Sequence, residues 1–74
     1  MNSKTLHYSI CIEWSDEDQA FLVTLPEWAD HVIMPATHGD TYDEALRNGQ
    51  EVLELLTEAW EAGEIAPPKK ILVA

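Results

Sequence analysis

The chain has 74 residues, which is enough for one small domain but not for two ordinary domains or a large enzyme cleft. Four Lys and Arg against fourteen Asp and Glu give a formal net charge of −10 at pH 7. This charge argues against direct binding to nucleic acid or to anionic membranes, because both need a surface of Lys and Arg. A hydrophobic content of 46% predicts a folded chain rather than a disordered one. A basic molecule is the natural partner of such a domain.

Cysteine content and terminal composition constrain the compartment. Cys11 is the single cysteine, so no intramolecular disulfide can form, and we expect a buried, unreactive thiol. The N-terminal segment lacks the apolar stretch of a signal peptide, and no apolar run reaches the roughly 18 residues of a membrane span. These observations favour a cytoplasmic protein.

Alternating apolar and polar residues predict two strands near the start of the chain. The first covers residues 6–14 and places its large apolar side chains on one face. Residues 15–19 carry three acids and predict an exposed hairpin connection. The second strand follows over residues 20–25 and ends at Pro26, which has no backbone N–H for a sheet.

The middle of the chain is less regular. Val32 and Ile33 are β-branched, which predicts a third strand over residues 30–37, and Pro35 makes that strand short and irregular. Residues 38–40 are expected to form a turn before a helix.

The helix has the strongest local signals. Thr41 and Glu44 form a T-x-x-E capping box, in which each side chain can bind the free backbone N–H of the other residue. Apolar residues then follow at steps of three and four, which predicts a helix over residues 42–62 with one face against a sheet. Gly63 suits the left-handed conformation just beyond a helix end. A final short strand is predicted over residues 69–73.

The element order is therefore β-β-β-α-β within a single domain, residues 1–74. It predicts an α+β fold, a two-layer sandwich with one helix across one face of the sheet. The last strand would return by a right-handed crossover. Small size and broad apolar stripes favour a homo-oligomer, because exposed apolar surface can be buried between copies.

Residues with the chemistry of an active site do not form a recognisable motif. The three histidines, His7, His31 and His38, are not spaced as metal ligands, and the chain has neither a phosphate-binding glycine loop nor a nucleophile elbow. The acidic run Asp16, Glu17 and Asp18 is shorter than a calcium-binding loop and lacks its glycine. We therefore expect no metal site, no cofactor and no catalysis.

Two other features suggest contact with a protein, although each has an alternative interpretation. Trp28 lies in a loop-like stretch, where its ring is either an exposed apolar anchor or packed over the sheet edge. A run of glutamates lies along the predicted helix and faces either a basic partner or water: Glu51, Glu54, Glu58 and Glu61.

Several segments taken together resemble a known family. They are YSICIEWS at 8–15, FLVTLPE at 21–27, GDTYDEA at 39–45, EVL at 51–53 and IAPP at 65–68. In this order they resemble the HicB-like antitoxin domain of type II toxin–antitoxin systems, over about residues 7–70. The stretch 28–37 is longer and more proline-broken than the usual link of that family.

The resemblance implies a β-β-β-α-β fold similar to a degraded ribonuclease H core. It also implies a function, which is to bind and mask a small basic HicA-type toxin that cleaves mRNA. Typical members continue into a DNA-binding domain that residues 1–74 do not contain, so we expect no autoregulation on DNA. The candidate partner-binding residues are acidic, with one tryptophan: Asp16, Glu17, Asp18, Trp28, Glu54, Glu58 and Glu61.

Two alternatives to this function stay open. One is an orphan homo-oligomeric scaffold or regulatory binding module with the same fold and no toxin partner. The other is a degenerate nuclease, which the lack of an acidic metal-binding constellation disfavours.

Overall fold

The computed structural model describes residues 7–69. Within this range the chain forms β1 (Cys11–Ser15), β2 (Ala20–Thr24), a single 3-10 turn η2 (Pro26–Trp28), β3 (Thr37–Gly39) and α1 (Tyr42–Glu61). The predicted β-β-β-α order is thus confirmed as far as the description reaches. Apart from Lys69, the strand predicted at 69–73 lies outside the described residues.

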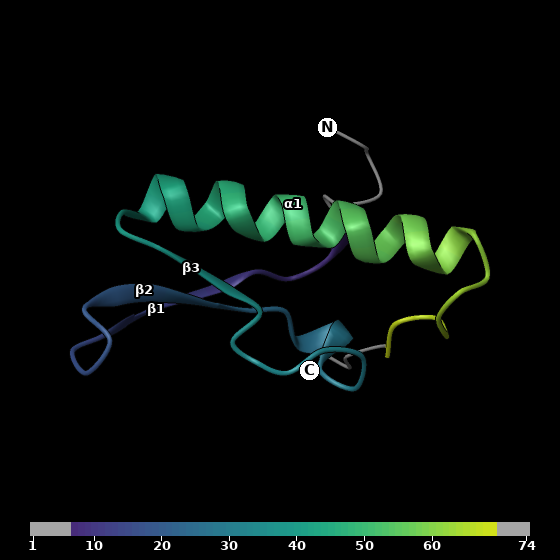
Figure 1. The fold of residues 1–74 in the computed structure, drawn as a ribbon, viewed down its shortest axis with the longest axis horizontal. Helices are drawn as coiled ribbons and strands as arrows, with labels where there is room; N and C mark the ends of the chain where they lie inside the picture. The colour runs from purple at the N-terminus through teal and green to yellow at the C-terminus, as the bar shows by residue number, and fades with distance from the viewer. Residues whose placement is uncertain (1–6, 70–74) are drawn as a thin grey trace.

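The three described strands form one antiparallel sheet in the order β1-β2-β3. Ile12 pairs with Val23 in β1–β2, and Val23 pairs in turn with Thr37 of β3. α1 runs along one face of this sheet (Figure 1). The result is a small two-layer α+β fold, as the element order predicts.

The core lies between the sheet and α1. Val23 and Leu25 from the second strand region and Leu53 from the helix are each fully buried. The predicted helix stripe is confirmed at its centre, because Ala45, Gly49, Leu53 and Leu56 are all buried. Tyr8, Ile10 and Ile12 are half-buried against this cluster, as the predicted alternation requires, but Trp14 at the end of that pattern is 48% exposed. The first strand is also shorter than the predicted 6–14, because within the described residues it begins only at Cys11 and ends at Ser15.

The third strand was predicted in the wrong place. Residues 30–36 are not a strand, since His31 and Val32 both donate backbone hydrogen bonds to the Trp28 carbonyl, at 2.9 and 3.3 Å, and prolong the turn that follows η2. Pairing with β2 begins only where the Ala36 N–H donates to the Val23 carbonyl at 2.8 Å. His38 and Gly39, predicted as a turn, therefore belong to β3.

The start of α1 matches its prediction with one difference. Thr41 is the N-cap, and its Oγ1 accepts a hydrogen bond from the Glu44 N–H at 3.0 Å. The Glu44 carboxylate accepts from the N–H of Asp40 at 3.0 Å rather than from that of Thr41. Both bonds still satisfy backbone donors around the first turn, which is the purpose of a capping box.

The outer side of the sheet is open to solvent, and this changes the environment of Cys11. The prediction that the Cys11 thiol is buried is wrong, because Cys11 is exposed. Its pairing with Thr24 places it, in the alternation of β1, on the face opposite to Ile12 and the helix.

Candidate protein-binding surface

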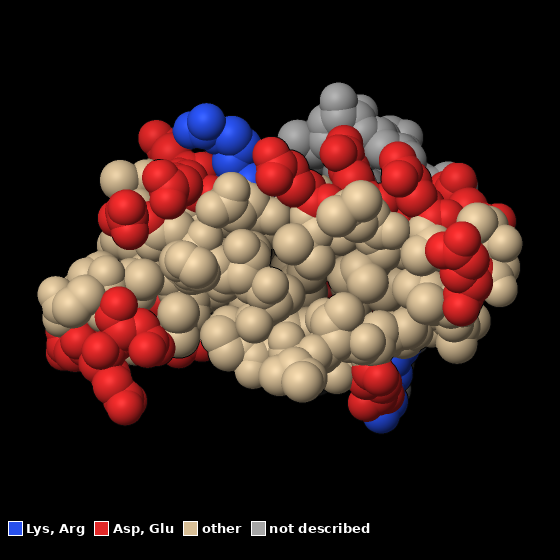
Figure 2. All heavy atoms as spheres, in the orientation of Figure 1, with Lys and Arg blue, Asp and Glu red and all other residues tan. Residues whose placement is uncertain are grey.

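The acids predicted to bind a partner fall into two groups. Asp16, Glu17 and Asp18 are exposed in the β1–β2 hairpin, at the end of the molecule where α1 begins. Glu54, Glu58 and Glu61 lie in the second half of α1, toward the opposite end. The structure therefore does not bring the six acids together into one site. Figure 2 shows acidic side chains both along α1 and at the hairpin end.

The hairpin acids are held by local hydrogen bonds. Asp16 accepts from the Trp14 indole N–H at 2.6 Å, and Asp18 accepts from the Ser15 hydroxyl at 3.0 Å. Ser15 in turn accepts from the Asp18 backbone N–H at 3.2 Å. The two carboxylates are thus fixed by neighbouring residues that alternate between the two faces of β1. The hairpin carries one fixed carboxylate toward each face of the sheet.

The glutamates of α1 share one side of the helix. Glu51, Glu54, Glu58 and Glu61 follow one another at steps of three and four residues, and such neighbours lie on adjacent turns. Leu55, 66% exposed, lies one turn from Glu51 and from Glu58. We call these five residues the acidic helix face. An exposed apolar side chain that is surrounded by charged residues is a common arrangement at protein interfaces.

The last turn of α1 carries acids where a helix end favours cations. A helix C-terminus carries partial negative charge, which cations stabilise and anions destabilise. The last turn of α1 has no basic residue and instead includes Glu58 and Glu61. All fourteen acids of the chain lie within residues 7–69, where Arg47 and Lys69 are the basic residues.

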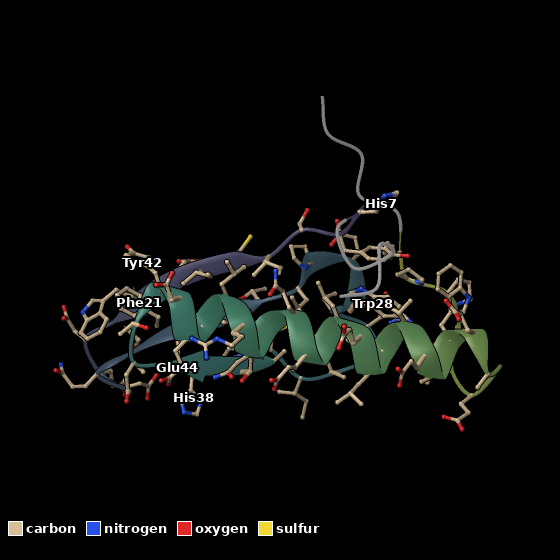
Figure 3. All side chains as sticks on the ribbon, turned by 90° about the horizontal axis from the view of Figure 1, so that it is seen from above. His7, Phe21, Trp28, His38, Tyr42 and Glu44 are labelled. Carbon is tan, nitrogen blue, oxygen red and sulfur yellow. The ribbon has the colours of Figure 1, made fainter. Side chains whose placement is uncertain are left out.

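Trp28 does not serve as an exposed anchor, so that candidate is wrong. Its side chain is 0% exposed and packs edge-on against Tyr8 and Trp60, with ring centroids 5.4 and 6.4 Å away. η2 follows the end of β2 and places the Trp28 ring in the core (Figure 3). The alternative interpretation of Trp28, as a packing residue, is the one that the structure supports.

Sequence reasoning missed Leu55 as an exposed apolar residue. Its signal is present in the sequence, because Leu55 is apolar yet lies outside the stripe that contains Leu53 and Leu56. An apolar residue on the polar side of an amphipathic helix has no core to enter.

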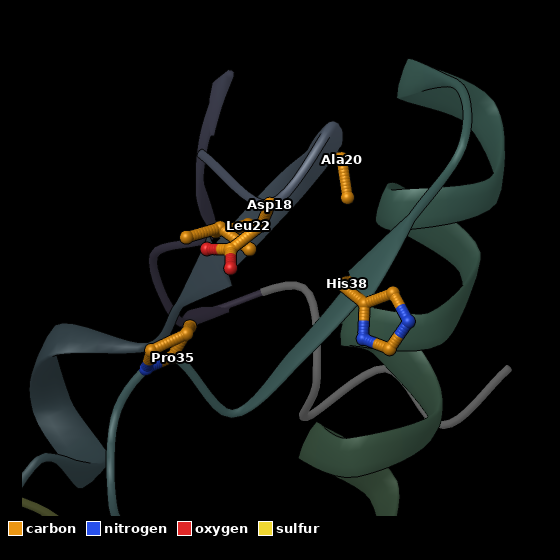
Figure 4. Close-up of a pocket in the computed structure, with 5 residues that line it drawn as sticks. All are labelled: Asp18, Ala20, Leu22, Pro35 and His38. Atoms are coloured by element: carbon orange, nitrogen blue, oxygen red, sulfur yellow. The ribbon is translucent and has the colours of Figure 1, made fainter. Parts of the chain in front are cut away.

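The open face of the sheet has a shallow hollow of about 380 Å³ near the hairpin. Its walls combine apolar surface with one carboxylate and one imidazole, drawn in Figure 4: Asp18, Ala20, Leu22, Pro35 and His38. Leu22 and His38 are direct cross-strand partners. Such a lining can hold a side chain of a partner, but it offers no nucleophile paired with a base.

Within residues 7–69, no three His, Cys, Asp or Glu side chains are grouped so that they could hold a metal ion. In the same range, no helix has both the length and the apolar character required to cross a membrane.

Comparison with protein-family models, with curated proteins and with solved structures found no match.

Proposed function

We propose that this chain is a HicB-like, antitoxin-type module that binds a small basic HicA-type protein and masks its RNA-cleaving surface. The acidic helix face carries this proposal. An RNA-cleaving protein needs a cationic surface to hold phosphates, and a surface of opposite charge both steers toward it and covers it. Masking of this kind requires no catalytic residue in the inhibitor.

The arrangement of charges on α1 supports the interpretation that its glutamates face a cationic partner rather than only water. Like charges at spacings of three and four residues destabilise a helix by a few tenths of a kcal/mol per pair, and acids in its last turn oppose its dipole. A cationic partner relieves both effects, so Glu54 and Glu58 gain more from binding than scattered acids would. Leu55 supplies apolar contact among them.

The fold is compatible with the family resemblance. Three antiparallel strands followed by one helix are the first four elements of the proposed ribonuclease H-like arrangement. The Lys69 N–H donates to the Glu27 carbonyl at 2.8 Å, which brings the chain after α1 back to the loop that follows β2.

The proposal predicts that a small basic protein is encoded beside this chain, and the test uses that protein; a genome without such a neighbour would contradict the proposal. That protein alone should cleave RNA, and an equimolar amount of this chain should abolish cleavage. The variant Leu55→Ala/Glu58→Lys should inhibit poorly, whereas Asp30→Asn, which removes one exposed acid outside both the acidic helix face and the hairpin, should inhibit like the wild-type chain. Undiminished cleavage in the presence of excess wild-type chain would refute the function.

A homo-oligomeric module without a toxin is the second candidate. One observation favours it, since Ile33 is 91% exposed in the loop before β3, close in sequence to the Pro35 that lines the open-face hollow. Apolar surface of this kind can be buried between copies. Sedimentation of the wild-type chain and of Ile33→Ser tests it. If the second candidate is right, the wild-type chain sediments as an oligomer and the Ile33→Ser variant sediments as a monomer.

A further inference from the structure

Three aromatic rings form a continuous cluster at the end of the molecule where the hairpin meets the start of α1. Trp14 of β1 contacts Phe21 of β2 edge-on at 5.0 Å between ring centroids. Phe21 contacts Tyr42, the first residue of α1, at 4.2 Å with the planes tilted by 36°. Figure 3 shows Phe21 and Tyr42 together at this end, away from the buried Trp28. We call Trp14, Phe21 and Tyr42 the aromatic end.

Much of this cluster faces solvent. Trp14 is 48% exposed and Tyr42 is 63% exposed, although such rings are normally buried when a core can receive them. The fold offers these two rings no core to enter, because α1 begins at Tyr42 and the sheet ends at the hairpin beside Trp14. Exposed Trp and Tyr are the residues most enriched among those that dominate binding energy at protein interfaces.

Acidic residues surround the aromatic end. The Asp16 carboxylate accepts a hydrogen bond from the Trp14 indole N–H at 2.6 Å, so an acidic group is held at the ring edge. Further exposed acids stand in the hairpin and at the start of α1, and Figure 2 shows acidic side chains on both: Glu17, Asp40, Asp43 and Glu44. The local electric field therefore favours the binding of a cation against the faces of these rings.

We propose that the aromatic end binds an arginine side chain of a basic protein. The guanidinium group is planar, stacks on aromatic faces and is weakly hydrated, so it gains from the indole face and from the Asp16 carboxylate together. Lysine offers charge without a stacking plane. A second copy of this chain is disfavoured as the occupant, because it would bring the same acids against each other.

The basic protein in this inference is the partner of the proposed function, on which the inference rests. The aromatic end would be a second contact, separate from the acidic helix face. Its chemistry can be tested without that partner, by a short peptide that carries one arginine.

The experiment titrates the full chain with acetyl-Gly-Arg-Gly-amide and follows the indole N–H and tyrosine ring signals by NMR. The arginine peptide should shift the signals of Trp14 and Tyr42 and leave those of the buried Trp28 in place. The matched lysine peptide should bind about threefold more weakly or worse, and the uncharged citrulline peptide should cause no shift. These comparisons use the wild-type protein alone.

Two variants assign the effect to the aromatic end. Trp14→Leu keeps an apolar residue and should weaken the arginine peptide about threefold, and Asp16→Asn, which keeps a hydrogen-bond acceptor, should also weaken it. Leu55→Ala, an exposed apolar change on the acidic helix face, should leave the affinity unchanged.

Equal shifts from the arginine and lysine peptides, or shifts that survive Trp14→Leu, would overturn the inference, because they would indicate attraction to net charge only. Line broadening of Trp14 with protein concentration, without peptide, would assign the surface to a second copy and would also overturn it. The proposed function fails separately, when excess chain leaves RNA cleavage undiminished.

Discussion

Gly39 of β3 lies directly against the backbone of Ala45 in the first turns of α1. A Cβ placed on Gly39 would stand 2.4 Å from the Ala45 nitrogen and 2.7 Å from its Cα. Ala45 is itself fully buried, and its N–H is bonded to the Thr41 carbonyl. The shortest strand of the sheet and the start of the helix are therefore joined by backbone contact, which positions the aromatic end as well as the core.

Gly39→Ala should be severely destabilising, because a backbone neighbour cannot move aside as a side chain can. We expect a loss of about 3 kcal/mol or more in the free energy of unfolding, measured by urea denaturation. Gly49→Ala is the matched control. Its Cβ would meet side-chain atoms, Val23 Cγ1 at 3.0 Å and Ile10 Cγ2 at 3.4 Å. There the helix-propensity gain of about 1 kcal/mol offsets crowding. Equal losses in the two variants would contradict the backbone contact.

Thr41→Ala should remove the N-cap of α1. Its Oγ1 accepts the Glu44 N–H, and the loss of such a cap costs about 1 kcal/mol of stability. Thr41→Ser keeps the hydroxyl and should lose much less. Thermal unfolding followed by circular dichroism compares the two, and identical melting temperatures would show that the cap does not stabilise the helix.

Trp28 should tolerate replacement by another large ring. Its Nε1 is buried, with no hydrogen-bond partner in the described part of the chain, so Trp28→Phe loses ring volume but also removes an unsatisfied donor. We expect a loss of about 1–2 kcal/mol for Trp28→Phe and about 3–5 kcal/mol for Trp28→Ala, from chemical denaturation. A Trp28→Ala chain that is as stable as wild type would contradict the burial of this ring.

Glu58→Gln should stabilise the free chain. It removes an acid from the last turn of α1 and from between Glu54 and Glu61, and both changes are worth a few tenths of a kcal/mol at low salt. The gain, measured by urea denaturation, should shrink as salt rises, because surface charges are screened. Glu17→Gln in the hairpin is the control and should show no such gain. A less stable Glu58→Gln chain would mean that Glu58 serves the fold rather than a partner.

The helix and the first hairpin could be predicted because their signals are local. α1 ends one residue from its predicted end, since Thr41 and Gly63 mark its limits in the sequence itself; Gly63 has φ +77°, as expected beyond a helix end. β3 could not be located in this way. The apolar pair Val32 and Ile33 has a strand-like composition, but pairing depends on where the chain meets Val23, and that is a contact between distant segments.

The candidate site was predictable in its charge but not in its shape. The acids are exposed except for Glu54, which is half-buried, yet the sequence does not reveal that the hairpin acids and those of the second half of α1 lie toward opposite ends. Trp28 illustrates the same limit. Its loop setting left two positions open, exposed or packed over the sheet edge, and only the fold shows that η2 turns it inward against Tyr8 and Trp60. Burial of a loop residue depends on the tertiary fold, which local pattern does not encode.

The central claim is that the acidic helix face binds a basic protein. Calorimetric titration of this chain with the small basic protein encoded beside it tests the claim most directly. We predict a one-to-one complex whose dissociation constant rises with salt, and rises about tenfold or more in Glu54→Gln/Glu58→Gln. No binding, or a dissociation constant that this double variant leaves unchanged, would contradict the claim.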